Sequence, residues 1–136
     1  MESKTLYSQQ KPGMDGGYTE LKVYQLAYRL AMEIFEISKS FPKEEKYSLT
    51  DQIRRSSRSV AVNIASGYRR RNYPKHFTSK MTDSDEECTE TQVWLNFSKD
   101  CQYLDEQTKN RLLKEYTEVG RMLGSMAQHP EKFLPR

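Results

Sequence analysis

Residues 48–67 read SLTDQIRRSSRSVAVNIASG, and the spacing of this stretch predicts an amphipathic helix. At about 100° per residue, three cations gather on one side: Arg54, Arg55 and Arg58. The opposite side carries the residues suited to packing, which are Leu49, Ile53, Ser57, Val60, Ala61 and Ile64. The helix therefore has one face for a core and one basic face.

The two ends of this helix can also be predicted from the sequence. Ser48 and Asp51 have the spacing of a capping box, with Asp in place of the usual Glu. We expect the helix to end at Gly67, because glycine readily adopts the left-handed conformation of a C-terminal cap. Asn72 can cap the next helix, with Pro74 in its first turn. Three consecutive arginines then lie at the corner between the two helices: Arg69, Arg70 and Arg71.

Three further helices are predicted around this one. The first spans residues 19–40 and begins at Thr19, the third spans residues 73–100, and the fourth follows Asp105 and stops at His129 and Pro130. Because the connections are short, neighbouring helices should run antiparallel. The sequence thus predicts an all-α fold, an antiparallel up-and-down four-helix bundle over residues 19–128, with a flexible N-terminal arm (1–18) and a C-terminal tail (129–136).

The first predicted helix carries more apolar surface than one bundle core requires. One row, spaced by three and four residues, holds Leu21, Tyr24, Tyr28, Ala31 and Phe35. An adjacent row holds Val23, Leu26, Leu30, Ile34 and Ile37. We therefore expect this helix to serve both a core and a subunit contact.

The fourth predicted helix carries two glycines on one face. Gly120 and Gly124 lie four residues apart. Glycine costs about 1 kcal/mol in a helix interior relative to alanine. We therefore expect another backbone to approach closely there.

Positive charge is concentrated in one segment of the 136 residues. Residues 51–80 hold eight Lys and Arg against one acid, a net charge of +7, whereas the rest of the chain carries −4. Guanidinium groups match phosphate oxygens, and a basic patch gains affinity for a polyanion by releasing its counterions. The candidate nucleic-acid-binding residues are Arg54, Arg55, Arg58, Arg69, Arg70, Arg71 and Lys75.

Two aromatic residues flank the arginine corner, Tyr68 and Tyr73, and could stack on unpaired bases. An alternative for the arginines is ion pairing within or between subunits. The third predicted helix offers five acids for such pairs: Asp83, Asp85, Glu86, Glu87 and Glu90.

Other classes of function find little support in the sequence. The acidic run lacks the Glu-x-x-His pairs of di-metal bundles and the glycine of a calcium loop, so we expect no metal or other cofactor. Cys88 stands among carboxylates, which disfavour a reactive thiolate, so we expect no catalytic residue and two reduced thiols. No apolar run is long enough to span a membrane, and we expect a cytoplasmic protein.

The segment from Lys22 to Arg71 resembles a known family, the four-helix-bundle proteins first noticed as reading frames within intervening sequences of bacterial large-subunit ribosomal RNA. The resemblance covers residues 20–127 and rests on the order and spacing of Phe41, Pro42, Glu45, Tyr47, Leu49, Gln52, Arg54, Arg55, Ser59, Asn63, Ile64, Ala65 and Gly67. It implies a homopentameric barrel of four-helix bundles. A related branch resembles the accessory variability protein of diversity-generating retroelements, a basic pentamer that associates with a reverse transcriptase and nucleic acid.

These observations lead to two hypotheses. In the first, the chain is a non-enzymatic homo-oligomer, a pentamer, whose basic surface binds RNA or DNA. In the second, it is an assembly or adaptor protein whose basic face forms subunit salt bridges and whose ligand is another protein, such as a reverse transcriptase.

Overall fold

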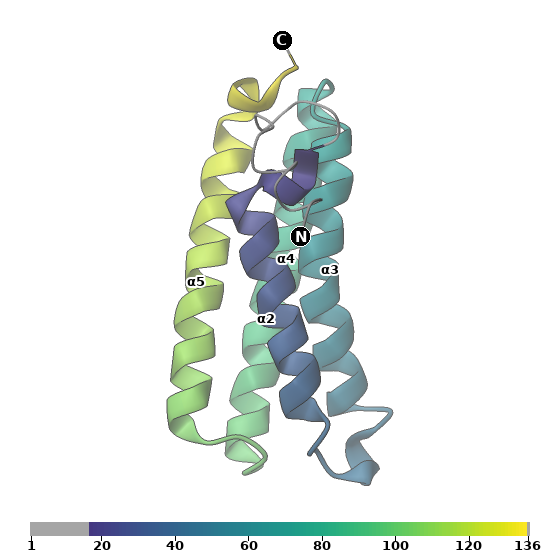
Figure 1. The fold of residues 1–136 in the computed structure, drawn as a ribbon, viewed down its shortest axis with the longest axis vertical. Coiled ribbons are helices and arrows are strands. Elements are labelled where there is room, and N and C mark those ends of the chain that lie inside the picture. Colours follow the sequence, from purple (N-terminus) through teal and green to yellow (C-terminus); the bar gives the residue numbers. More distant parts are fainter. Residues whose placement is uncertain (1–16, 136) are drawn as a thin grey trace, which may run out of the picture.

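The computed structural model describes residues 17–135, and over that range the chain forms helices and no strand. Four long helices follow one another, α2 (Lys22–Ser38), α3 (Leu49–Arg69), α4 (Pro74–Asp100) and α5 (Glu106–Gln128). Three short 3₁₀ helices accompany them, η1 (Gly17–Glu20), η2 (Lys43–Glu45) and η3 (Pro130–Phe133). The prediction of an all-α chain with four helices is confirmed (Figure 1).

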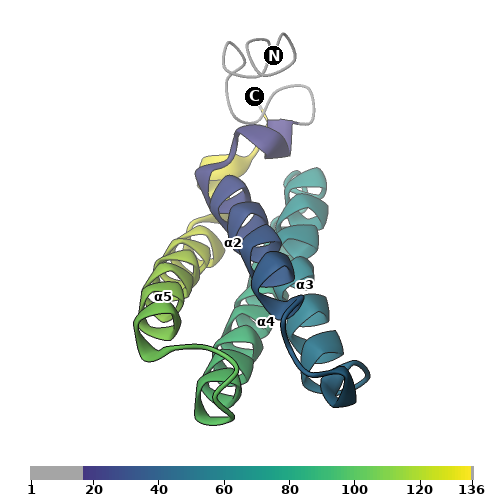
Figure 2. The same ribbon diagram turned by 60° about the horizontal axis from the view of Figure 1, so that its bottom comes forward.

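The four helices lie alongside one another and pack around one core. In Figure 1, α2 and α4 run down the view while α3 and α5 run up it. Both α2 and α4 pack against α3 and α5, so α2 and α4 occupy opposite corners. Figure 2 shows the α2–α3 and α4–α5 connections together at one end of the molecule. The α3–α4 corner lies at the other end.

The core is filled by large apolar side chains from all four helices. The largest fully buried side chains are Tyr68, Tyr116, Phe77, Leu30, Ile34, Ile53, Ile64, Met81, Leu95, Leu112, Leu123 and Val23. Each such burial stabilises the fold by about 1.5–3 kcal/mol relative to exposure. On α2 the row that contains Leu30 and Ile34 is the more deeply buried one. In the other row Ala31 is buried as well, whereas Tyr28 is 54% exposed.

Helix α4 places small polar side chains in the core. Ser84 donates to the carbonyl of Val60 at 2.8 Å, and Thr91 donates to the hydroxyl of Ser56 at 2.8 Å. These bonds satisfy the buried hydroxyls and tie α4 to α3. The thiol of Cys88 similarly contacts the carbonyl of Tyr116 on α5 at 3.2 Å. This composition explains why α4 shows only a weak apolar period in the sequence.

Several predicted helix ends differ in the structure. Ser48 makes no side-chain cap; instead Glu45 accepts bonds from the Ser48 hydroxyl and the Leu49 amide, because the η2 turn brings its carboxylate to the start of α3. Asn72 does not cap α4, whose N-cap position is Tyr73. The prediction that Asp105 caps the last helix is confirmed, since its carboxylate accepts from the Thr108 amide at 2.7 Å.

Gly67 lies inside α3 and not at its end, so its predicted role as a cap was wrong. The residue is buried against α4. A Cβ at this position would lie 2.4 Å from Cε of Met81 and 2.8 Å from Cβ of Lys80. The glycine therefore serves the close packing of α3 on α4. Gly120 and Gly124 face no other backbone so closely: the former has only Asp85 nearby, and the latter has no atom within 4 Å of its built Cβ among the described residues.

A cluster of four charges joins α2 to α5. Arg29 and Glu33 lie on α2, and Arg111 and Glu115 lie on α5. Arg29 pairs with Glu115 at 2.5 Å, and Arg111 pairs with both Glu33 and Glu115. The charges alternate in sign around the cluster, so each carboxylate faces two guanidinium groups. We call this group the α2–α5 seam.

Residues beyond both predicted boundaries of the bundle pack against it. Tyr18, placed in the predicted arm, lies in η1 and packs edge-on against Tyr24 at 5.0 Å. The remainder of that arm, residues 1–16, lies outside the described residues. In the predicted tail, Phe133 of η3 stacks on Phe77 at 5.2 Å.

Candidate nucleic-acid interface

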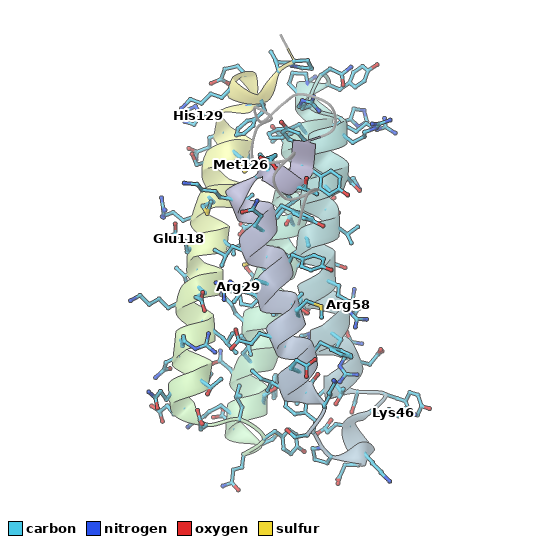
Figure 3. All side chains as sticks on the ribbon, viewed as in Figure 1. Arg29, Lys46, Arg58, Glu118, Met126 and His129 are labelled. Atoms are coloured by element: carbon cyan, nitrogen blue, oxygen red, sulfur yellow. The ribbon has the colours of Figure 1, made fainter. Side chains whose placement is uncertain are left out.

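The seven predicted binding residues fall into two groups. We call the first, Arg54, Arg55 and Arg58, the arginine row; it runs along α3. We call the second, Arg69, Arg70, Arg71 and Lys75, the corner; it covers the end of α3 and the start of α4. Figure 3 labels Arg58 at the boundary between α2 and α3.

Arg54 binds the C-terminal end of α2. Its Nε donates to the Ser38 hydroxyl at 2.7 Å, and its Nη2 reaches the carbonyl of Phe35 at 3.4 Å. The guanidinium also lies 4.7 Å from the Phe35 ring centroid. A helix C-terminus carries partial negative charge and unpaired carbonyls, so a cation there is stabilising. Arg54 thus joins two helices and is partly buried, which limits its access to a ligand.

The other two members of the row differ in their surroundings. Arg55 pairs with Glu90 of α4 at 2.7 Å and lies 4.0 Å from Glu87. Arg55 is therefore already paired within the chain, as the ion-pairing alternative predicted. Arg58 is exposed and lies 5.6 Å from the same Phe35 ring, and among the described residues it forms no ion pair with a carboxylate.

At the corner, Arg71 folds back onto the end of α3. Its guanidinium lies 4.4 Å from the ring centroid of Tyr68, and its Nη1 donates to the Tyr68 carbonyl at 3.0 Å. Tyr68 itself is 1% exposed, so the expectation that it could stack on a base was wrong: its ring belongs to the core. Arg71 thus stabilises a helix end in the same way as Arg54 does.

The remaining corner cations point to solvent. Arg69, Arg70 and Lys75 are exposed, and within residues 17–135 none of them forms an ion pair. Tyr73 is 55% exposed between them, with the ring of His76 at 6.1 Å. The first turn of α4 begins here without a side-chain cap, and its free amides favour an anion. Cations, an exposed ring and a helix N-terminus therefore meet at one end of the bundle.

The acids of α4 form a separate surface. Asp83 and Glu86 are exposed and, in the part of the chain that the structure describes, form no ion pair. Partial burial, together with neighbouring Glu90, raises the pKa of Glu87, although Arg55 opposes this effect. Burial likewise raises the pKa of Asp85. The exposed carboxylates of Asp83 and Glu86 give the outer side of α4 negative charge, which disfavours contact with phosphate.

Three further features of the described residues concern metal ligands, thiols and helix apolarity. Within residues 17–135, no group of three or more His, Cys, Asp or Glu side chains could hold a metal ion. Both cysteines are free thiols; burial beside Asp85 raises the pKa of Cys88 to about 12, whereas Cys101 is exposed. None of the helices over this range combines the length and apolarity that a membrane crossing demands.

Comparison with known proteins gives the chain its family. Residues 19–125 match the model of the 23S rRNA-intervening sequence protein family. The chain belongs to this family. A similar solved structure is that of a protein of unknown function from the S23 ribosomal protein family of Bacteroides thetaiotaomicron VPI-5482, determined at 1.70 Å resolution. The two chains share 23% identity with a TM-score of 0.70, and the match covers 78% of this chain and 95% of the other. This likeness shows the shared fold, and no curated protein matches the chain.

Sequence reasoning overlooked one surface of this family member. A groove of about 470 Å³ between α2 and α3 is lined by Tyr18, Tyr24, Tyr28, Ala31, Met32, Arg58, Ala61, Val62, Ala65 and Ser66. The available signal was the apolar row on α2 that contains Tyr24 and Tyr28. Together with the adjacent row it led us to expect a subunit contact on this helix, but it did not define the groove.

Proposed function

We propose that this family member is a non-enzymatic homo-oligomer, a pentamer of antiparallel four-helix bundles, that binds RNA or DNA through its corner. The observation that carries the proposal is the set of exposed cations at the corner, Arg69, Arg70 and Lys75, none of which is paired with an acid among the described residues. The arginine row contributes less, because Arg54 and Arg55 are engaged within the chain.

The chemistry of the corner suits a phosphate backbone. Guanidinium and ammonium groups provide affinity without base recognition, and the free amides of the α4 N-terminus add donors. Tyr73 offers an exposed ring beside these cations, which suits an unpaired base. The family description names an intervening sequence of 23S rRNA, which makes RNA the first ligand to test.

The test is fluorescence anisotropy with labelled single strands and duplexes of RNA and DNA at several salt concentrations. We expect saturable binding with a steep negative salt dependence. Replacing Arg69, Arg70 and Lys75 together by Ala should weaken binding and reduce the slope of log K against log salt by about 2 to 3. A matched control removes three other exposed cations at a distance from the corner: Lys43, Lys46 and Lys114. Equal weakening by both triple variants would show that binding depends on the net charge of the protein and not on the corner.

The second hypothesis, an adaptor with a protein ligand, is favoured by one observation. Arg54 and Arg55, two of the seven predicted binding residues, already have partners within the chain. Absence of binding to every nucleic acid at low salt, with the protein folded, would favour the adaptor.

A further inference from the structure

Exposed apolar side chains gather on two separate faces of the bundle. On the first face, Tyr28, Met32 and Val62 are 54%, 47% and 60% exposed along the α2–α3 groove. On the second face, Val93 and Phe97 of α4 are 44% and 53% exposed, and the ring of Trp94 lies 5.8 Å from that of Phe97. Single exposed apolar residues are ordinary, but contiguous groups mark interaction surfaces.

The two faces carry opposite charge. The first includes Arg58, which lines the groove together with Val62. On the second, Glu86, Glu90, Val93 and Phe97 are spaced by four, three and four residues, so they form one stripe on the outer side of α4. Glu86 has no partner cation among the described residues. Glu90 is already paired with Arg55. Each face therefore has apolar side chains beside one charge without an ion-pair partner among the described residues, Arg58 on the first and Glu86 on the second, as complementary surfaces require.

A contact of one face with its own copy would bring like charges together, so a contact between the two unlike faces is favoured. Helices α2 and α4 occupy opposite corners of the bundle, and both pack on α3 and α5. The α2–α3 groove and the outer side of α4 thus turn in different directions. When two copies join through unlike faces, the pair still has one free face of each kind. A third copy can therefore bind, and successive copies can close into a ring.

We propose that the α2–α3 groove of one copy docks on the outer α4 face of the next, with Arg58 meeting the acidic side chains around Glu86. This inference rests on the homo-oligomer part of the proposed function and assigns the surfaces that form it. A nucleic acid is the wrong occupant for this pair of faces, because the α4 carboxylates repel phosphate. The corner cations lie at one end of each bundle, outside both faces, and remain available to a ligand.

The test measures the mass of the full chain by size-exclusion chromatography with light scattering. The single chain has a mass of 16.0 kDa, and we expect the wild type to elute at a multiple of it. Arg58→Glu and Val62→Glu each alter one exposed residue of the groove, and each should raise the dissociation midpoint about tenfold or more. Lys114→Glu on α5 makes the same charge reversal as Arg58→Glu outside both faces and should leave the mass unchanged.

Exchanging the charges of Arg58 and Glu86 tests whether these two side chains meet in the assembly. Glu86→Lys should also lower the mass, and Arg58→Glu combined with Glu86→Lys should restore it. Circular dichroism must show the wild-type helix content for each variant, and Val62→Glu provides an independent variant if Arg58→Glu fails to fold. The assignment of the faces would be overturned if the folded Arg58→Glu and Val62→Glu proteins kept the wild-type mass. It would also be overturned if the double variant stayed dissociated. Neither result would overturn the homo-oligomer itself. A monomeric wild type would overturn the homo-oligomer as well, whereas nucleic-acid binding by the corner is scored separately by anisotropy.

Discussion

Replacing Gly67 by Ala tests the contact between α3 and α4 most directly. The new methyl group would lie 2.4 Å from Cε of Met81 and 2.8 Å from Cβ of Lys80, whereas carbon atoms pack best at about 3.5–4.0 Å. Met81 can change rotamer only within a full core, since its side chain is wholly buried. The Lys80 Cβ is fixed to the backbone, so relief there requires movement of α4.

The expected magnitude follows from two opposing terms. Overpacking of a core costs about 1–3 kcal/mol, and two contacts this short place the cost in the upper half of that range. Alanine returns about 1 kcal/mol through its higher helix propensity. The net loss of stability should therefore be about 1–2 kcal/mol, which lowers the melting temperature by roughly 4–8 °C in a domain of this size.

Gly124→Ala is the matched control. It makes the same chemical change inside a helix, but nothing described lies within 4 Å of the new Cβ. It should stabilise the chain by about 0.5–1 kcal/mol. Urea unfolding followed by circular dichroism, at one fixed protein concentration because assembly shifts apparent stability, measures both variants. A Gly67→Ala protein as stable as the wild type or more so would refute the packing argument.

Three other predictions concern the core and the seam. A thiol reagent should modify Cys101 in the folded protein and Cys88 only on unfolding, because burial raises the Cys88 pKa to about 12; rapid reaction of two thiols without denaturant would contradict this. Bonds from the seam guanidinium groups lower the pKa of Glu115, so its contribution to stability is present above the unfolded value of about 4.5 and is lost as the pH falls through the folded value. Glu115→Gln should therefore cost about 0.5–1 kcal/mol near neutral pH and almost nothing in acid, as urea unfolding at two pH values can check. Ser84→Ala leaves the Val60 carbonyl without this donor and should cost about 1 kcal/mol by the same assay, with unchanged stability speaking against the bond.

The sequence predicted the helices well where their apolar period is strong. In α3, Ile53, Val60 and Ile64 repeat on one face, and all three are buried. The prediction that Gly67 ends the helix was wrong, because the rule for helix ends considers only neighbouring residues in the chain. The glycine is required instead by its packing against Met81 on another helix. The outward side of α4 could not be separated from its core side by hydropathy, since Ser84 and Thr91 are fully buried.

The candidate site shows the same division between local and tertiary information. The sequence located the positive charge correctly but could not say which cations are already engaged. Arg54 and Arg71 both bind the carbonyls of helix ends, and Arg55 pairs with Glu90 across two helices. Those partners lie on other turns or other elements, and only the fold brings them together. The cations that are exposed and form no ion pair among the described residues are fewer than the predicted site and lie mostly at one end of the bundle.

The α2–α5 seam has a consequence for the order in which the chain folds. The α2–α3, α3–α4 and α4–α5 contacts each join consecutive helices, so short loops bring their partners together. The seam joins residues far apart in the chain: Arg29 and Glu115 are 86 positions apart, and Glu33 and Arg111 are 78 apart. Closing so long a loop costs more entropy before any contact is gained, and local contacts form faster. Consecutive helix hairpins should therefore form early, and the meeting of these four charges should be among the last events of folding.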